Sequence, residues 1–202
     1  AMAAEAAVLM DRLGMSAEQA GNLMQSANIT GKSITTLKTE MVGAVVAVEN
    51  ANGVTLDLKS IIMEASSVTG EMRANFGGSV VEIAKGIAMA KSFGMELKDL
   101  ASASASLLDF ESSIQAELEA ELLTGKQLNL ERARAAALAG DQATLAEELN
   151  KNIGTYAEFS KLNVLQRQAQ AKAMGMTVDQ MEEILNKGKS IEEQMHEARA
   201  AG

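Results

Sequence analysis

The chain has no cysteine, no proline and no tryptophan, and it has a single histidine. Without cysteine it can form no disulfide, no thiolate nucleophile and no cysteine-ligated metal cluster. The absence of proline over 202 residues favours helices that run without kinks. Four phenylalanines and one tyrosine are too few aromatic residues to build an aromatic ligand cage or a base-stacking surface. These absences leave a helical protein with little side-chain chemistry.

The charge balance of the chain is acidic, with 18 Lys and Arg against 27 Asp and Glu and a net charge of −9. This balance disfavours a phosphate-binding surface, so we expect no nucleic-acid partner. Uncharged runs such as residues 41–48 and 100–108 are far shorter than the ~18 residues of a membrane-spanning helix, so we expect no membrane contact. The chain begins at Ala1 and ends within a helix-like run, so we expect residues 1–202 to be an all-helical fragment of a longer chain.

Helix starts and stops are marked clearly in the sequence. A Ser or Thr followed three residues later by Glu or Gln predicts a capping box, in which each side chain bonds the other residue's backbone N–H. Glycine marks the helix ends, because it adopts the left-handed conformation without a Cβ penalty. The predicted capping boxes are Ser16/Gln19, Ser79/Glu82, Thr155/Glu158, Thr177/Gln180 and Ser190/Glu193, and the predicted stops are glycines 14, 53, 94, 125, 140, 154, 175 and 188.

Between these signals the apolar residues recur every three or four positions, which is the spacing of a buried helical face. Residues 42–48 are rich in valine and could form a short buried strand, but the spacing that starts at Ile34 favours a helix. Carboxylates such as Glu111, Glu117, Glu119 and Glu121 fall between the apolar positions and are expected on a solvated face. The three predicted stripes are Ile34, Leu37, Met41, Val45 and Val48; Val54, Leu58, Ile61, Ala65 and Val68; and Leu107, Phe110, Ile114, Leu118 and Leu122.

One short motif occurs three times, at Gly14-Met15, Gly94-Met95 and Gly175-Met176. In each copy an apolar residue precedes the glycine and a polar helix starter follows the methionine, which predicts a tight helix-to-helix corner. The spacing of about 80 residues is compatible with a duplicated unit. Three independent joints in a methionine-rich chain remain the favoured interpretation, because the residues between the corners show no similarity. The sequence thus predicts an all-α multi-helix bundle or helical repeat, with possible sub-units 1–93 and 94–202.

Gly31-Lys32-Ser33 has the ending of a phosphate-binding loop but not its frame. That loop needs a glycine five residues before Gly31, where this chain has Ser26, and it needs a preceding strand. We therefore interpret Ser33 as the cap of the next helix. Gly125-Lys126 lacks both the upstream glycine and the following Ser or Thr.

His196 has Glu192 and Glu193 at helical spacing, which in principle could hold a divalent cation. A solvated helix face with a favourable charge near the helix end is the simpler interpretation. The sequence therefore predicts no catalytic, cofactor-binding or metal-binding residues, no cofactor and no enzymatic activity.

The second half of the chain resembles phage tail tape-measure proteins. The resemblance lies in an Ala- and Leu-rich helical region within residues 107–185: LLDFESSI at 107–114, ELEAELLTGK at 117–126, LNLE at 128–131, AR at 133–134, AGD at 139–141, LAEE at 145–148 and AMGM at 173–176. It implies a structural protein of the virion tail, assembled in the host cytoplasm with chaperones, packed in the tail tube and helping to set tail length.

Composition and periodicity by themselves leave three functions open. The first is the tape-measure fragment, which would contact tail-tube proteins, assembly chaperones or its own copies. The second is a generic helical interaction module, such as an adaptor or assembly chaperone. The third is an enzyme with a carboxylate-metal site. A methionine- and alanine-rich helical surface suits close helix packing and therefore the first two.

Overall fold

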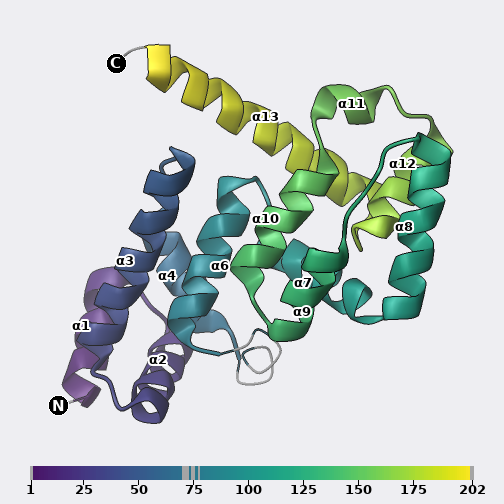
Figure 1. The fold of residues 1–202 in the computed structure, drawn as a ribbon. Helices are drawn as coiled ribbons and strands as arrows, with labels where there is room; N and C mark the ends of the chain where they lie inside the picture. The colour runs from purple at the N-terminus through teal and green to yellow at the C-terminus, as the bar shows by residue number, and fades with distance from the viewer. Residues whose placement is uncertain (1, 70–72, 74–75, 77, 201–202) are drawn as a thin grey trace. The chain divides into compact units, whose positions relative to one another are not determined.

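The structure is all-α, as the sequence predicts. The computed structural model describes residues 2–69, 73, 76 and 78–200, and these residues contain twelve helices and no strand (Figure 1). None of the described helices is both long enough and apolar enough to cross a membrane. The helices are α1 (Met2–Leu13), α2 (Ala17–Thr30), α3 (Ile34–Asn52), α4 (Leu58–Ser67), α6 (Val80–Ser92), α7 (Leu97–Leu108), α8 (Phe110–Thr124), α9 (Glu131–Ala139), α10 (Gln142–Ile153), α11 (Tyr156–Ser160), α12 (Val164–Ala173) and α13 (Val178–Ala200).

The chain divides into two compact units, residues 1–88 and residues 89–202, and the division falls within α6. The predicted sub-unit boundary after residue 93 stays a prediction. In the first unit α2, α3 and α4 pack on one another, and α1 packs on α2 and α3. The stripe from Ile34 to Val48 is fully buried on α3, so residues 42–48 form a helix and not a strand. In the second predicted stripe, Ile61, Ala65 and Val68 are buried, but α4 begins only at Leu58 and Val54 lies before it.

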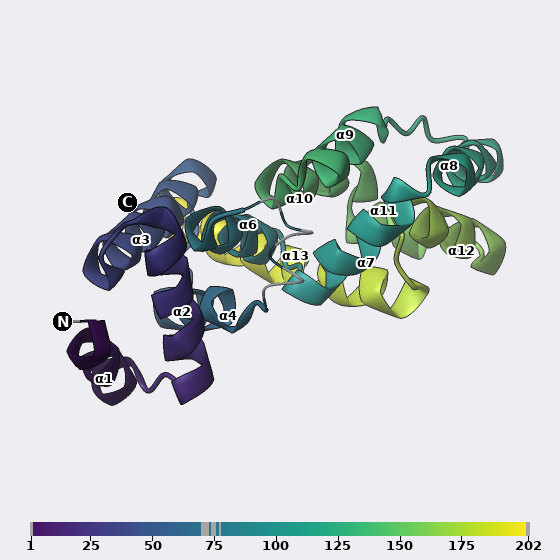
Figure 2. The same cartoon turned by 90° about the horizontal axis from the view of Figure 1, so that it is seen from below.

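Two groups of helices pack together within the second unit. Helices α7, α9 and α10 pack together around Leu100, Leu107, Leu145 and Leu149, all fully buried. Helix α8 packs along α12, and the two lie side by side in both views (Figures 1 and 2). Helix α13 packs on α11 and α12. The interior of this unit is therefore built from several short helices and from the longer α13.

Most of the predicted caps are confirmed. Ser16/Gln19, Thr155/Glu158 and Thr177/Gln180 form reciprocal capping boxes. Ser79 accepts a hydrogen bond from the Glu82 N–H at 3.2 Å, so it caps α6. Glycines 14, 53, 94, 125, 140, 154 and 175 all have positive φ and follow helix ends as predicted.

The predicted helix stop at Gly188 and the predicted helix start at Ser190/Glu193 are wrong. Both lie inside α13, which runs without a break from Val178 to Ala200. The backbone of Phe93 and Gly94 lies beside Gly188, and a Cβ placed on Gly188 would meet only the Phe93 carbonyl oxygen, at 3.9 Å. This distance is an ordinary van der Waals contact, so Gly188 has room for a side-chain carbon, and the continuous helix α13 outweighs the local preference of glycine for a helix end.

The three Gly-Met corners are confirmed. Gly14, Gly94 and Gly175 have φ of 68°, 80° and 68°, and the following methionines are buried. At the second corner the Met95 N–H bonds the Ala90 carbonyl at 2.9 Å and the Gly94 N–H bonds the Lys91 carbonyl at 3.1 Å. Residues 171–176 repeat this pair of bonds at the third corner, with distances of 2.9 and 3.0 Å. Both are Schellman motifs, which turn the chain while satisfying the last helix carbonyls.

The third predicted stripe is wrong. Leu107 is buried on α7, but α7 ends at Leu108 and α8 begins at Phe110, with Asp109 as its cap, so the five residues do not share one helix. The buried residues of α8 are small: Ser113, Ala116 and Ala120. Small side chains let α8 lie close to α12, and this contact turns the large apolar residues of α8 outward. Those four residues, Phe110, Ile114, Leu118 and Leu122, are 44%, 46%, 55% and 86% exposed.

We predict that Gly94→Ala destabilises the second unit more than Gly125→Ala does. Both glycines have positive φ, which costs an alanine about 1 kcal/mol. A Cβ at Gly125 meets nothing within 4 Å, whereas one at Gly94 lies 2.8 Å from the Lys187 Cβ and 3.0 Å from the Ile184 carbonyl oxygen. This overpacking adds roughly 1 to 3 kcal/mol. The measurement is urea unfolding followed by fluorescence of Tyr156, and equal losses for the two variants would contradict the close packing of the corner.

Candidate functional site

The motifs that suggested phosphate binding serve the helix ends instead. Gly31 has a φ of 67° and ends α2, and Ser33 caps α3 by accepting the Thr36 N–H at 3.0 Å. The Lys32 ammonium bonds both carboxylate oxygens of Glu40, at 2.7 and 2.8 Å. The interpretation of this segment as a capping loop is confirmed.

The second glycine-lysine pair also has a structural role. Gly125 ends α8 with a φ of 69°. The Lys126 ammonium donates to the Asn152 carbonyl at 3.1 Å and lies 3.9 Å from a carboxylate oxygen of Glu158. Lys126 therefore ties the end of α8 to the end of α10 and to α11.

His196, Glu192 and Glu193 lie on α13, and their side chains are outside the described residues. Over the described residues, no group of three or more His, Cys, Asp or Glu side chains is placed to hold a metal ion. A cleft of about 420 Å³ in the second unit is lined by Phe93, Tyr156, Ile184 and Lys189 among others, and its described lining contains no carboxylate or imidazole.

Glu117 and Arg134 form an ion pair that the sequence analysis missed. A carboxylate oxygen of Glu117 lies 2.6 Å from the Arg134 guanidinium, and the side chains are only 13% and 12% exposed. The other carboxylate oxygen accepts the Leu130 N–H at 2.9 Å, and Arg134 also donates to Ser113 at 3.1 Å. One turn later Glu121 accepts the Leu128 N–H at 2.7 Å. These two carboxylates therefore hold residues 125–130 against α8 rather than lying on a solvated face, as the sequence analysis expected.

This arrangement fixes which face of α8 is exposed. The small residues are buried, with Ser113 bonded to Arg134 of α9, and Glu117 and Glu121 face the segment before α9. The exposed surface carries Phe110, Ile114, Leu118 and Leu122. We call these four residues the α8 stripe. Each follows the one before by four residues, so they form one continuous ridge along the helix. A contiguous apolar row of this kind is typical of an interaction surface, whereas single exposed leucines are not.

The start of α12 lies beside the end of α8. Gln166, in the first turn of α12, donates its side-chain N–H to the Leu123 carbonyl at 2.8 Å. Val164 and Leu165 directly precede Gln166 and are 69% and 65% exposed. The first turn of α12, which carries these two exposed apolar residues, is therefore bonded to the end of α8 that carries Leu122.

The border of the α8 stripe is acidic. Glu111 and Glu119 are exposed on α8, and Glu119 bonds Lys172 of α12 at 2.9 Å. The candidate functional site is thus an apolar ridge with carboxylates beside it, which is suited to binding another helix.

Comparison of the chain with protein-family models, with curated proteins and with solved structures found no match.

Sequence reasoning missed the α8 stripe because large apolar residues at a spacing of four usually mark the buried face. A second signal was present: Ser113, Ala116 and Ala120 form a row of small residues on the same helix. When a helix carries a small-residue row and a large apolar row, close packing by the small row leaves the large row free for a partner.

We predict that Glu117→Ala destabilises the fold far more than Ile114→Asp. The first change leaves the buried Arg134 and the Leu130 N–H without their acceptor, at a cost of roughly 2 to 4 kcal/mol. The second places a carboxylate at a half-exposed position and costs about 1 kcal/mol or less. Urea midpoints of the two variants test this order. A larger loss for Ile114→Asp would show that the α8 stripe is buried.

Proposed function

We propose that this chain is a structural, non-enzymatic part of a phage tail tape-measure protein and that the α8 stripe is the surface through which it assembles. The observation that carries the proposal is the α8 stripe, a row of four large apolar side chains on an exposed helix face. The resemblance to tape-measure proteins covers residues 107–185, which include α8 and α12. A protein that packs into a tail needs apolar surface on its separate parts, because neighbouring proteins bury it on assembly.

The partner that fits the α8 stripe is an amphipathic helix with basic residues beside its apolar row. From Phe110 to Leu122 the α8 stripe extends about 18 Å at 1.5 Å per residue, or a little over three helical turns. The acidic border favours Lys and Arg on the partner, whereas a second copy of α8 would place carboxylates against carboxylates. Tail-tube proteins and assembly chaperones are the partners that the resemblance implies, and such a helix on one of them would cover the α8 stripe.

On this proposal the chain acts in the virion tail after assembly in the host cytoplasm. The role requires shape, length and apolar contact, and it requires no cofactor, metal, nucleic acid or membrane. The polar groups of α8 fit this role, since Glu117 and Glu121 are engaged in holding the fold and leave the apolar row outward.

We predict that Leu118→Glu/Leu122→Glu in the parent gene blocks tail assembly and leaves the fold intact. Both residues are more than half exposed, so each change should alter stability by about 0.5 kcal/mol or less. The loss of two of the four apolar side chains and the added charge should reduce assembled tails at least about tenfold. Tails are counted by electron microscopy, and circular dichroism checks the fold.

The matched control is Gln115→Glu/Gln127→Glu. These two glutamines are exposed and lie outside the α8 stripe, so the control adds the same charge without removing apolar surface. It should assemble tails in normal numbers. Normal assembly by the Leu118/Leu122 variant would exclude the α8 stripe as the assembly surface, whereas failure of both variants would assign the effect to charge alone.

A further inference from the structure

The second and third Gly-Met corners pack on each other's following helix. A Cβ placed on Gly94 would lie 2.8 Å from the Lys187 Cβ and 3.0 Å from the Ile184 carbonyl oxygen, both on α13. A Cβ placed on Gly175 would lie 2.6 Å from the Ser106 Cβ and 2.9 Å from the Ala103 Cα, both on α7. Helix α7 follows Gly94 and helix α13 follows Gly175, so each corner docks on the helix that the other corner begins.

The two docking contacts have the same register. Ala103 and Ser106 follow Gly94 by nine and twelve residues, and Ile184 and Lys187 follow Gly175 by nine and twelve residues. Each glycine therefore meets the same two positions of the opposing copy. Equal contacts in both directions are the property of an isologous interface, in which two copies are related by a twofold axis.

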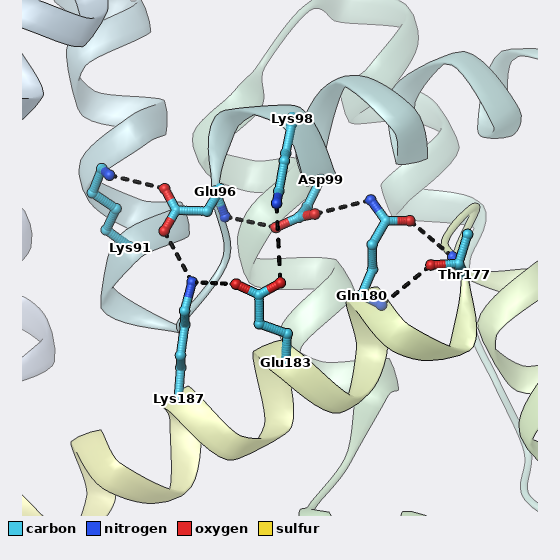
Figure 3. Close-up of polar contacts among 8 residues, drawn as sticks. All are labelled: Lys91, Glu96, Lys98, Asp99, Thr177, Gln180, Glu183 and Lys187. Atoms are coloured by element: carbon cyan, nitrogen blue, oxygen red, sulfur yellow. Dashed lines mark hydrogen bonds and ion pairs between the residues drawn. The ribbon is translucent and has the colours of Figure 1, made fainter.

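Asp99 and Gln180 lie where this axis passes. Each is the fifth residue after its glycine, and each accepts the backbone N–H of its own helix cap: Asp99 from Glu96 at 2.8 Å and Gln180 from Thr177 at 2.9 Å. The Gln180 side chain also donates to Asp99 at 3.0 Å (Figure 3). A position that bonds its own counterpart in the other copy lies on a twofold axis.

Residues at equal distances from Gly94 and Gly175 are alike at the apolar positions, whereas the charged positions differ between the two copies. Met95 and Met176, Leu100 and Met181, and Ala103 and Ile184 are counterparts, and all six are buried. Glu96 bonds Lys91 at 3.0 Å and Lys187 at 3.1 Å, whereas its counterpart is Thr177. Partial burial alone would raise the pKa of the Glu96 carboxyl, but hydrogen bonds from the two lysines outweigh burial and lower that pKa below its usual value.

At the first corner, the fifth residue after the glycine makes the same kind of contacts with a different element. Gln19 is the fifth residue after Gly14, and it accepts the Ser16 N–H at 2.8 Å. Its side chain also donates to the Met63 carbonyl at 3.2 Å and the Ser67 hydroxyl at 2.8 Å, at the end of α4. At all three corners the fifth residue after the glycine therefore closes the cap and bonds a group on the element packed against it.

We infer that residues 90–106 and 171–187 are two copies of one self-complementary docking module, and that the partner this module recognises is a second copy of itself. The module consists of a Gly-Met corner, a capped helix start, an amide or carboxylate five residues after the glycine and apolar residues six and nine after it. The module docks through the corner backbone and the fifth residue. Of the two interpretations of the Gly-Met spacing, the duplicated unit is the one that accounts for the reciprocal contacts of the second and third corners.

The test exchanges the two axial residues. Asp99→Gln alone leaves one amide oxygen where two carboxylate oxygens accepted the Glu96 N–H and the Gln180 side chain. Gln180→Asp alone opposes two carboxylates, so each single variant should lower the folding equilibrium constant about tenfold or more. The double variant Asp99→Gln/Gln180→Asp places the shorter side chain, the aspartate acceptor, on α13 and the longer side chain, the glutamine donor, on α7. If the two backbones are equivalent, the same three hydrogen bonds form again, and the double variant should recover at least half of the summed shift in urea midpoint.

The matched control is Asp99→Asn/Gln180→Glu, which reverses donor and acceptor but keeps both side-chain lengths. It restores the hydrogen bond whether or not the two copies are equivalent. Tyr156, the single tyrosine, lies in the second unit, and its fluorescence reports unfolding there. Recovery by both double variants supports the module. Recovery by the control alone shows that the two sites are not equivalent, and recovery by neither shows that the axial contact is absent; both results overturn the inference.

Discussion

The second unit depends on a steric constraint at two glycines. Gly94 and Gly175 each need a positive φ to turn the chain, and each lies so close to an opposing helix that a side chain would overlap it. Glycine meets both requirements because it has no Cβ. Because of this contact α7 and α13 start from corners that fix each other's position, and Leu100, Met181 and Met95 are fully buried around them.

Helix α8 shows how a fold selects the surface that it leaves exposed. It packs on α12 and buries small residues, and its carboxylates at Glu117 and Glu121 hold the backbone of the next segment. Each of these interactions uses a part of the helix that is poor in large apolar groups. The large apolar side chains stay exposed in the α8 stripe after folding. Burying them against a partner would therefore contribute favourable hydrophobic free energy to binding. This division between folding and binding surfaces is the physical basis of the proposed assembly role.

Local chemistry explains which parts of this structure could be predicted from sequence. A capping pair such as Ser16 and Gln19, a helix-ending glycine such as Gly140 and the buried stripe of α3 depend on neighbours within one or two turns, and all are confirmed. The exposed face of α8 depends on Arg134 and α12, which are distant in sequence, so its periodicity alone suggested the opposite face. The local signals at Gly188 and Ser190 favoured a helix end and a new helix start, but α13 continues through both residues. Asp99 and Gln180 shared one offset from a glycine, but their contact required the arrangement in space.

The central claim, that the parent protein is a structural ruler, is tested most directly by duplicating residues 95–175 in frame after Gly175. The insertion adds 81 residues, preserves a Gly-Met corner at both joints and keeps the α8 stripe. At 1.5 Å per residue it should lengthen assembled tails by up to about 120 Å, and by less if the inserted segment stays folded. Electron microscopy of purified tails measures the change. Longer tails are the predicted result, and assembled tails of unchanged length would contradict the account.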